Sequence, residues 1–169
     1  MMPEGLLWLC NLVMDQEKYM KVLCRMQAKC SRQEMCVSDV RAKVLKAMDG
    51  DAEAAERMVE SLVGDRFVDD GRYAAAYARE KSSLSGWGAQ KISFMLAHKG
   101  IDRKVIAEAL EEVDADAAAK KLESVVAAKY RLVSEEPQCR LKLLKFAMGR
   151  GYGYDEVRAA VDRVMKGED

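Results

Sequence analysis

AQKISFMLAHKGI, at residues 89–101, decides the fold, because a similar stretch, RLKLLKFAMGRGY, follows at residues 140–152. A shift from 100 to 151 superposes two glycines, and apolar positions on both sides of them coincide as well. The coinciding pairs are Ile92 with Leu143, Ile101 with Tyr152, Ile106 with Val157, Leu110 with Val161 and Val113 with Val164. Self-similarity at a fixed period predicts a chain built from repeated structural units.

The same pattern occurs a third time, less regularly, near the start of the chain. Val40, Val44, Met58 and Leu62 repeat the apolar spacing, but the turn at residues 47–51 is one or two positions out of step. Each unit reads as helix, helix, glycine turn and helix. The predicted apolar faces of the three last helices are Ala55, Met58, Val59 and Leu62; Ile106, Ala109, Leu110 and Val113; and Val157, Ala160, Val161 and Val164.

These units predict an all-α fold of three tandem three-helix repeats, stacked into an elongated, curved array. The predicted helices span residues 16–31, 38–48, 52–64, 70–83, 87–99, 103–113, 116–133, 138–149 and 155–166. The predicted repeats cover 16–64, 65–114 and 115–169, and residues 1–15 form an N-terminal extension of unclear role. We interpret that extension, with its short apolar run at residues 6–13, as a docked or disordered segment.

The composition independently favours helix. The chain has no threonine and only three isoleucines and two prolines among 169 residues, whereas Ala, Leu, Met, Glu, Lys and Arg abound. Those abundant residues lose little side-chain freedom in a helix. The apolar run is too short to span a membrane and lacks the basic residues that precede a secretory signal, so a cytoplasmic protein is expected.

Charge alternates with the repeat although the formal net charge is zero. The first two helices of each unit are rich in Lys and Arg, and the third is acidic. One interpretation is that these are solvated faces with ion pairs between helices. The other is that basic helices align into a stripe that follows a phosphate backbone or an acidic protein surface, which predicts salt-sensitive binding.

Turn and cap residues mark the ends of the predicted helices. Gly100 and Gly151 stand where a helix ends, and glycine adopts the left-handed conformation there without a Cβ clash. Asp51, Asp70 and Asp102 precede helical runs and are predicted N-caps.

No catalytic or metal-binding set emerges. The five cysteines lack a zinc-ligand spacing and are expected to be reduced, partly buried thiols. The single histidine, His98, is interpreted as a residue at a helix C-terminus. Asp69 and Asp70 are better explained by capping than by metal binding or acid–base work. We therefore expect no cofactor, no metal and no enzymatic activity.

The aromatic residues near the centre of the chain are interpreted as structural, and for one of them, Trp87, a binding role is the alternative. Gly86-Trp87-Gly88 lacks the lysine and spacing of a phosphate-binding loop, and is interpreted as a tight connection into the helix beginning near Trp87. Trp87 is expected to be a half-buried anchor between units, or alternatively an exposed binding residue. Tyr73 and Tyr77 lie four apart on one helical face and are expected in the core.

The residues of the second unit resemble a known family. Phe67-Val68-Asp69-Asp70-Gly71-Arg72-Tyr73-Ala74, then Tyr77, Arg79, Lys81, Trp87-Gly88, Lys91-Ile92, Leu96 and Lys99-Gly100-Ile101, resemble the central signature of RecX regulatory proteins. Residues 38–44 and 144–152 resemble the flanking repeats, so the similarity extends over roughly residues 17–166. Residues 1–15 have no counterpart, and the first unit has Ala47-Met48 in place of the Lys-Gly turn.

The resemblance implies three three-helix repeats and a regulator of the RecA recombinase. Such proteins bind RecA and its filament on single-stranded DNA, and limit strand exchange, ATP hydrolysis and the co-protease function behind the SOS response. A monomer with possible weak direct contact to single- or double-stranded DNA is expected. The RecA or DNA contact candidates are Arg72, Arg79, Lys81, Lys91 and Lys99; the structural motif comprises Phe67, Asp69, Asp70, Tyr73, Tyr77, Trp87, Gly100 and Gly151. The alternatives are a DNA-binding protein that competes with RecA only by occupying DNA, and a helical scaffold with another partner.

Overall fold

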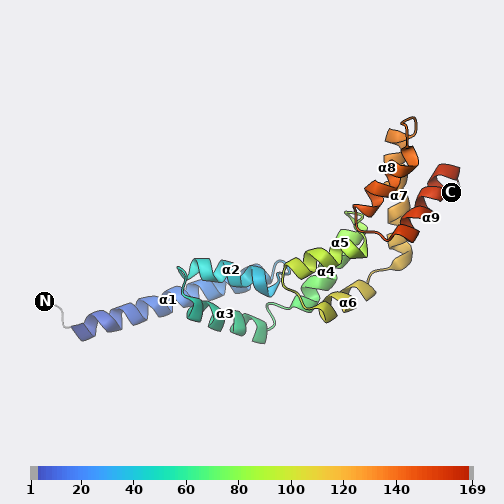
Figure 1. Cartoon of the computed structure of the whole chain (residues 1–169). Helices are drawn as coiled ribbons and strands as arrows, with labels where there is room; N and C mark the ends of the chain where they lie inside the picture. The colour runs from blue at the N-terminus through green and yellow to red at the C-terminus, as the bar shows by residue number, and fades with distance from the viewer. Residues whose placement is uncertain (1–3, 168–169) are drawn as a thin grey trace. The chain divides into compact units, whose positions relative to one another are not determined.

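The computed structural model describes the backbone of residues 4–167 and the side chains of residues 15–167. Within that range the regular structure consists of nine α-helices, in the order shown in Figure 1. The fold is therefore all-α, with three tandem three-helix repeats as predicted. The chain divides into two compact units, one ending at Tyr73 and the other beginning at Ala74. The repeat boundaries given above stay predictions.

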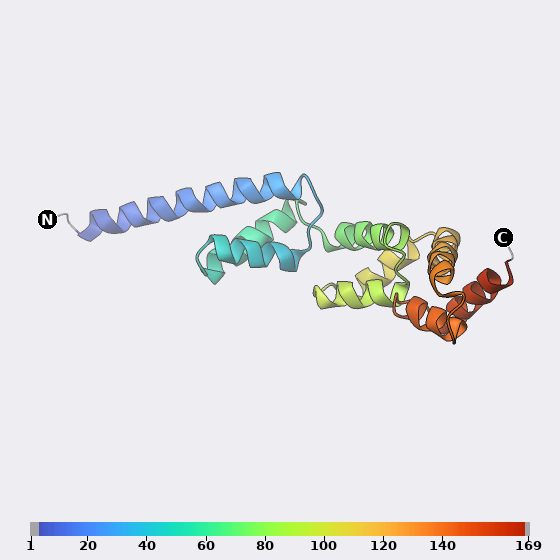
Figure 2. The ribbon, with the colours of Figure 1, turned by 90° about the horizontal axis from the view of Figure 1, so that it is seen from above.

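The first compact unit is built on helices α1 (Glu4–Cys30), α2 (Val37–Ala47) and α3 (Ala52–Gly64), each of which contacts the other two (Figures 1 and 2). Valines four residues apart place one face of α2 in the core. The fully buried members of this core include Val40 and Val44 from α2, and Met58 and Leu62 from α3. Val22 and Met26 of α1 cover them.

The first helix begins earlier than predicted. It runs without interruption from Glu4 to Cys30, whereas the expectation was a start at residue 16. The physical reason is that no glycine or proline occurs between Leu6 and Cys30, so nothing stops the helix from extending toward the N-terminus. The side chains of residues 1–14 and the backbone of residues 1–3 lie outside the described part of the chain, so the docking of this extension stays untested.

The second compact unit contains most of α4 (Asp70–Ser83), followed by α5 (Ala89–His98), α6 (Arg103–Glu111), α7 (Ala115–Val133), α8 (Cys139–Met148) and α9 (Tyr154–Lys166). α5 packs on α6, and α7, α8 and α9 pack on one another. The core of the last three helices takes Leu122 and Val126 from α7, Leu143 from α8, and Val157 and Val161 from α9.

The predicted glycine turns are confirmed. Gly100 and Gly151 end their helices at φ +78° and +88°. In the first unit the turn is made by Asp49 at φ +54° and Gly50 at φ +88°. Gly50 is one position out of step with Gly100, as the sequence comparison indicates.

Candidate functional site

The Asp69–Asp70 pair caps two different helices. Asp69 Oδ1 accepts from the backbone N–H of Arg72 at 3.0 Å, so Asp69 is the side chain that caps α4. Asp70 was predicted as that cap, and this is wrong: its Oδ1 accepts from the backbone N–H of Val37, the first residue of α2, at 2.8 Å. The N-cap residue of α2, Cys36, makes no side-chain capping bond, so Asp70 supplies the missing acceptor from a distant part of the chain.

The remaining predicted caps are confirmed, and two aromatic expectations are corrected. Asp51 accepts from Ala54 N–H at 3.0 Å and Asp102 from Lys104 N–H at 2.8 Å. Phe67 is half-buried and packs on the first core. Tyr73 and Tyr77 are only half-buried rather than core residues. The buried face of α4 consists of Ala74, Ala75, Ala78 and Ser82, and the two tyrosines lie off that face.

Arg72, a predicted contact residue, is engaged within its own unit. Its Nε donates to Glu34 Oε1 at 3.0 Å, and its Nη2 donates to the backbone oxygen of Arg66 at 3.0 Å. The hydrogen bond with Glu34 raises the pKa of the Arg72 guanidinium. Both side chains stay partly exposed, so the pair is open to exchange with another anion.

Arg79 and Lys81 are also paired, and Lys81 lies against aromatic rings. Arg79 Nη1 donates to Glu112 Oε2 at 3.0 Å, and Lys81 Nζ donates to the neighbouring Glu80 at 2.8 Å. The Lys81 ammonium also lies 5.3 Å from the Tyr77 ring centre and 5.7 Å from that of Trp87. Trp87 is half-buried, in agreement with the anchor interpretation.

Lys91 and Lys99 lie on α5 and at its end. The Lys91 ammonium is 4.4 Å from the Trp87 ring centre, a distance at which a cation is attracted by the ring face. Lys99 is the half-buried C-cap of α5, directly before Gly100. His98 is the exposed last residue of the same helix, as expected.

A close backbone contact joins the loop before α5 to the turn after α8. Gly88 N–H donates to the backbone oxygen of Arg150 at 2.9 Å, and Gln90 N–H donates to that of Gly151 at 3.1 Å. A Cβ on Gly88 would lie 2.3 Å from the Gly151 oxygen, and a Cβ on Gly151 would lie 2.4 Å from the Cβ of Lys91. Only glycine fits at either position.

This contact also explains why α5 begins at Ala89 and not near Trp87 as predicted. Trp87 N–H donates to the backbone oxygen of Lys81 at 3.0 Å, and Gly88 N–H donates to Arg150. These bonds hold residues 87 and 88 in a loop, and the first helical turn forms after them.

Sequence reasoning missed three cations on the segments that contact this loop, α7 and the turn after α8. Arg150 Nη1 donates to the backbone oxygen of Ser85 at 2.6 Å. A Cβ on Gly86 would lie 3.5 Å from Lys121 Cε, and Lys129 lies 5.6 Å from the ring centre of Phe146. The repeat itself carried a signal for Arg150, because the shift that aligns Gly100 with Gly151 aligns Lys99 with Arg150. No such signal pointed to Lys121 or Lys129.

Ion pairs account for part of the charge alternation. Arg41 of α2 pairs with Glu56 of α3 at 2.9 Å, and Arg140 of α8 pairs with Asp162 of α9 at 2.9 Å. Hydrogen bonds from these arginines lower the pKa of Glu56 and Asp162. The arginines of these basic helices are therefore paired with the acidic third helix of their own repeat.

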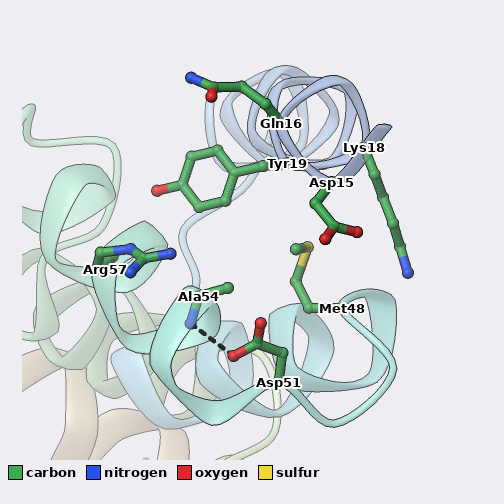
Figure 3. A pocket seen from close by; sticks show the side chains of 8 residues that line it. All are labelled: Asp15, Gln16, Lys18, Tyr19, Met48, Asp51, Ala54 and Arg57. Carbon is green, nitrogen blue, oxygen red and sulfur yellow. Dashed lines mark hydrogen bonds between the residues drawn. The ribbon is translucent and has the colours of Figure 1, made fainter. Parts of the chain in front are cut away.

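A pocket of about 510 Å³ lies between α1 and the beginning of α3 (Figure 3). Tyr19 and Met48 form part of its wall, and Asp51 faces it while capping α3. Its other charged residues include Lys18, which pairs with Asp49, and Arg57, which pairs with Glu53. Both of these cations are thus paired with carboxylates that do not line the pocket.

Neither metal-binding nor reactive-thiol chemistry is indicated within the described residues. No group of three His, Cys, Asp or Glu side chains among residues 15–167 is arranged to hold a metal ion. Cys24 is an exposed free thiol and Cys30, Cys36 and Cys139 are buried free thiols, as expected, whereas the side chain of Cys10 lies outside the described range. Burial raises the pKa of the Cys30 thiol, which makes it less reactive.

Among residues 4–167, no helix combines the length and the apolar character that crossing a bilayer demands.

Comparison with known proteins identifies relatives that are named RecX. A family model described as RecX, second three-helix domain, matches residues 69–110, which run from the Asp69 cap through most of α6. Regulatory protein RecX of Clostridium tetani is 31% identical over 119 residues, covering 68% of this chain and 54% of that protein. The chain spans about half the length of the curated relatives that it matches.

Two solved structures share the fold. The crystal structure of a regulatory protein RecX has a TM-score of 0.79 at 24% identity, covering 90% of this chain and 76% of the other. The crystal structure of RecX from Lactobacillus salivarius has a TM-score of 0.76 at 19% identity, covering 89% of this chain and 99% of the other. This chain is therefore similar to RecX regulatory proteins in the sequence of residues 69–110 and over much of its length, and it shares their fold.

Proposed function

We propose that this chain binds the RecA recombinase and its filament on single-stranded DNA, and inhibits the recombinase, ATPase and co-protease activities. It would thereby tune DNA repair, recombination and the SOS response from the cytoplasm, without catalysing a reaction. The observation that carries the proposal is the similarity to RecX proteins, which are named regulatory proteins. The contact candidates remain Arg72, Arg79, Lys81, Lys91 and Lys99.

The contacts of these cations support a binding role more strongly for some of them than for others. Lys91 forms no ion pair within the described residues, so its charge is available to an acidic partner. Arg72 and Arg79 are paired with Glu34 and Glu112, but exposed pairs of this kind contribute only about 0–1 kcal/mol. An arginine fork binds a carboxylate or a phosphate equally well, so a partner's anion can replace either glutamate.

The test of the proposal is a pull-down on RecA filaments, compared with naked single-stranded DNA at the same salt concentration. We expect the chain to bind the filament more tightly than the DNA alone, and to lower the RecA ATPase rate. Equal binding to both would favour the alternative, a helical DNA-binding protein that competes with RecA only by occupying DNA. Binding to neither would favour a scaffold with another partner.

Two matched charge-reversal variants test whether the lysines beside Trp87 belong to the surface that binds RecA. Lys81→Glu with Lys91→Glu changes the two lysines beside Trp87, and we expect it to weaken inhibition of the ATPase at least about tenfold, as loss of anion contacts should. Arg158→Glu with Lys166→Glu makes the same change in charge on α9, an acidic third helix, and should leave inhibition within about threefold. Circular dichroism checks that both variants keep their helices. Equal losses of ATPase inhibition in the two variants would contradict the placement of the binding surface beside Trp87.

A further inference from the structure

Four cations on the segments that contact the Ser85–Gly88 loop form no ion pair within the described part of the chain. They are Lys91 of α5, Lys121 and Lys129 of α7, and Arg150 after α8. No carboxylate among residues 15–167 lies within ion-pair distance of any of them, whereas Arg41, Arg57 and Arg72 of the first unit all have such partners. We call these four residues, with Lys81, the loop-85 cations.

Backbone contacts hold the loop-85 cations close to one another. Lys121, Val125 and Lys129 are spaced four apart on one face of α7, and the Lys121 and Val125 side chains touch the space beside Gly86. Arg150 reaches the Ser85 oxygen, and Gly151 lies against Lys91. The loop therefore lies against α7 and the turn after α8 and leads into α5, and each of these segments contributes positive charge.

Aromatic rings alternate with these cations. The Trp87 ring centre lies 4.4 Å from the Lys91 ammonium, and the Phe146 ring centre lies 4.9 Å from the Arg150 guanidinium carbon. Phe94, one helical turn after Lys91, is 71% exposed, which is unusual for phenylalanine. Cations that hold a backbone beside aromatic faces on which bases stack are typical of proteins that bind single-stranded nucleic acid.

Arg150 is incompletely satisfied. Its Nη1 donates to Ser85, but its Nε is buried without a hydrogen-bond partner. An outside anion cannot reach the buried Nε, so a phosphate would be bound only by the outer nitrogens of the guanidinium, through charge-assisted hydrogen bonds.

We propose that the loop-85 cations and Phe94 form a binding surface for single-stranded nucleic acid, with phosphates on the cations and a base stacked on Phe94. The inference deepens the proposed function, because it names the surface that would meet the strand of a filament. A strand fits better than an acidic peptide, since a peptide of carboxylates gives the exposed Phe94 ring nothing to stack upon.

The test measures binding of the full chain to a fluorescent oligothymidylate by anisotropy, without RecA. We expect Lys121→Glu with Lys129→Glu to weaken binding about 25-fold at about 0.1 M salt, because affinity scales with salt to the power of about −0.7 per neutralised phosphate. The matched control, Lys43→Glu with Lys46→Glu, changes two exposed lysines of the first unit that have no ion pair within the described residues, and should change binding less than about threefold.

A second arm tests stacking. Phe94→Ala should weaken binding to the oligothymidylate about tenfold, and leave binding to an abasic deoxyribose–phosphate strand of the same length unchanged. Equal loss in both lysine pairs, or binding of polyglutamate as tight as that of the strand, would overturn the proposal. Because RecA is absent from the assay, such a failure is separate from a failure of the filament pull-down.

Discussion

At the scale of single residues, the glycine turns show how one sequence feature performs two tasks. Gly100 and Gly151 occupy equivalent places in the repeat and both have positive φ. A Cβ on Gly100 would meet nothing within 4 Å, whereas a Cβ on Gly151 would collide with Lys91. Comparing the same substitution at Gly100 and Gly151 therefore distinguishes the free-energy cost of a left-handed conformation from that of a steric collision.

Gly100→Ala should lower the free energy of unfolding by about 1–2 kcal/mol, the cost of a left-handed alanine. Gly151→Ala should lower it by at least about 1 kcal/mol more, because backbone atoms must also move to relieve overlap. Urea unfolding of both variants measures the difference. Equal losses of unfolding free energy would show that Lys91 moves away from the new Cβ without destabilising the fold.

Asp69 makes the stability depend on pH. The hydrogen bond from the backbone N–H of Arg72 lowers the pKa of Asp69 below the usual value for an aspartate. A carboxylate with a lowered folded-state pKa stabilises the fold above its unfolded-state pKa, and that contribution disappears as pH falls through the folded-state value. We expect thermal stability to decline in acid, and Asp69→Asn to reduce this decline; an unchanged profile would contradict the role of Asp69.

At the scale of helices, Asp70 fixes the beginning of α2 although it belongs to α4. Asp70→Ala should therefore speed hydrogen exchange at the Val37 amide, whereas Asp69→Ala should speed it at the Arg72 amide. Each variant should lose about 1 kcal/mol, as expected for a cap. The two amides can be followed by NMR in the same experiment. Faster exchange at Arg72 in the Asp70 variant would contradict this assignment.

Helix positions could be predicted from the sequence because they depend on local spacing. Val40 with Val44, and Leu122 with Val126, mark their own buried faces, and glycines mark where helices end. The partners of Asp70 and Arg72 could not be predicted, since Val37 and Glu34 lie 33 and 38 residues away. The start of α1 was missed for a different reason, as an apolar run looks alike inside and outside a helix.

The candidate site was predictable only in part. The family motif pointed to Lys91 beside Trp87, and the structure brings those two together. It did not point to Lys121 or Lys129, because their relevance depends on how α7 packs against the loop before α5. Packing between repeats is a long-range property that a period in the sequence does not reveal.

At the scale of the whole molecule, salt should separate folding from binding. The ion pairs between helices, such as Arg41–Glu56 and Arg140–Asp162, are exposed and contribute little to stability. Raising salt from about 0.05 to about 0.5 M should thus shift the unfolding temperature by only about 2–3 °C. Filament binding should fall at least about tenfold over the same range. A parallel loss of both would mean that salt acts by unfolding the chain.

The glycine contact between Gly88 and Gly151 also bears on how such a chain could be lengthened. The loop of the second repeat meets the turn of the next repeat there, and both positions exclude a side chain. A duplicate of residues 65–114 placed in tandem would carry Gly88 at its loop and Gly100 at its turn, so it could join both neighbours. A duplicate of the third repeat would present Cys139 at the loop position instead. Gene duplication or protein design would therefore extend this architecture by copying its middle module.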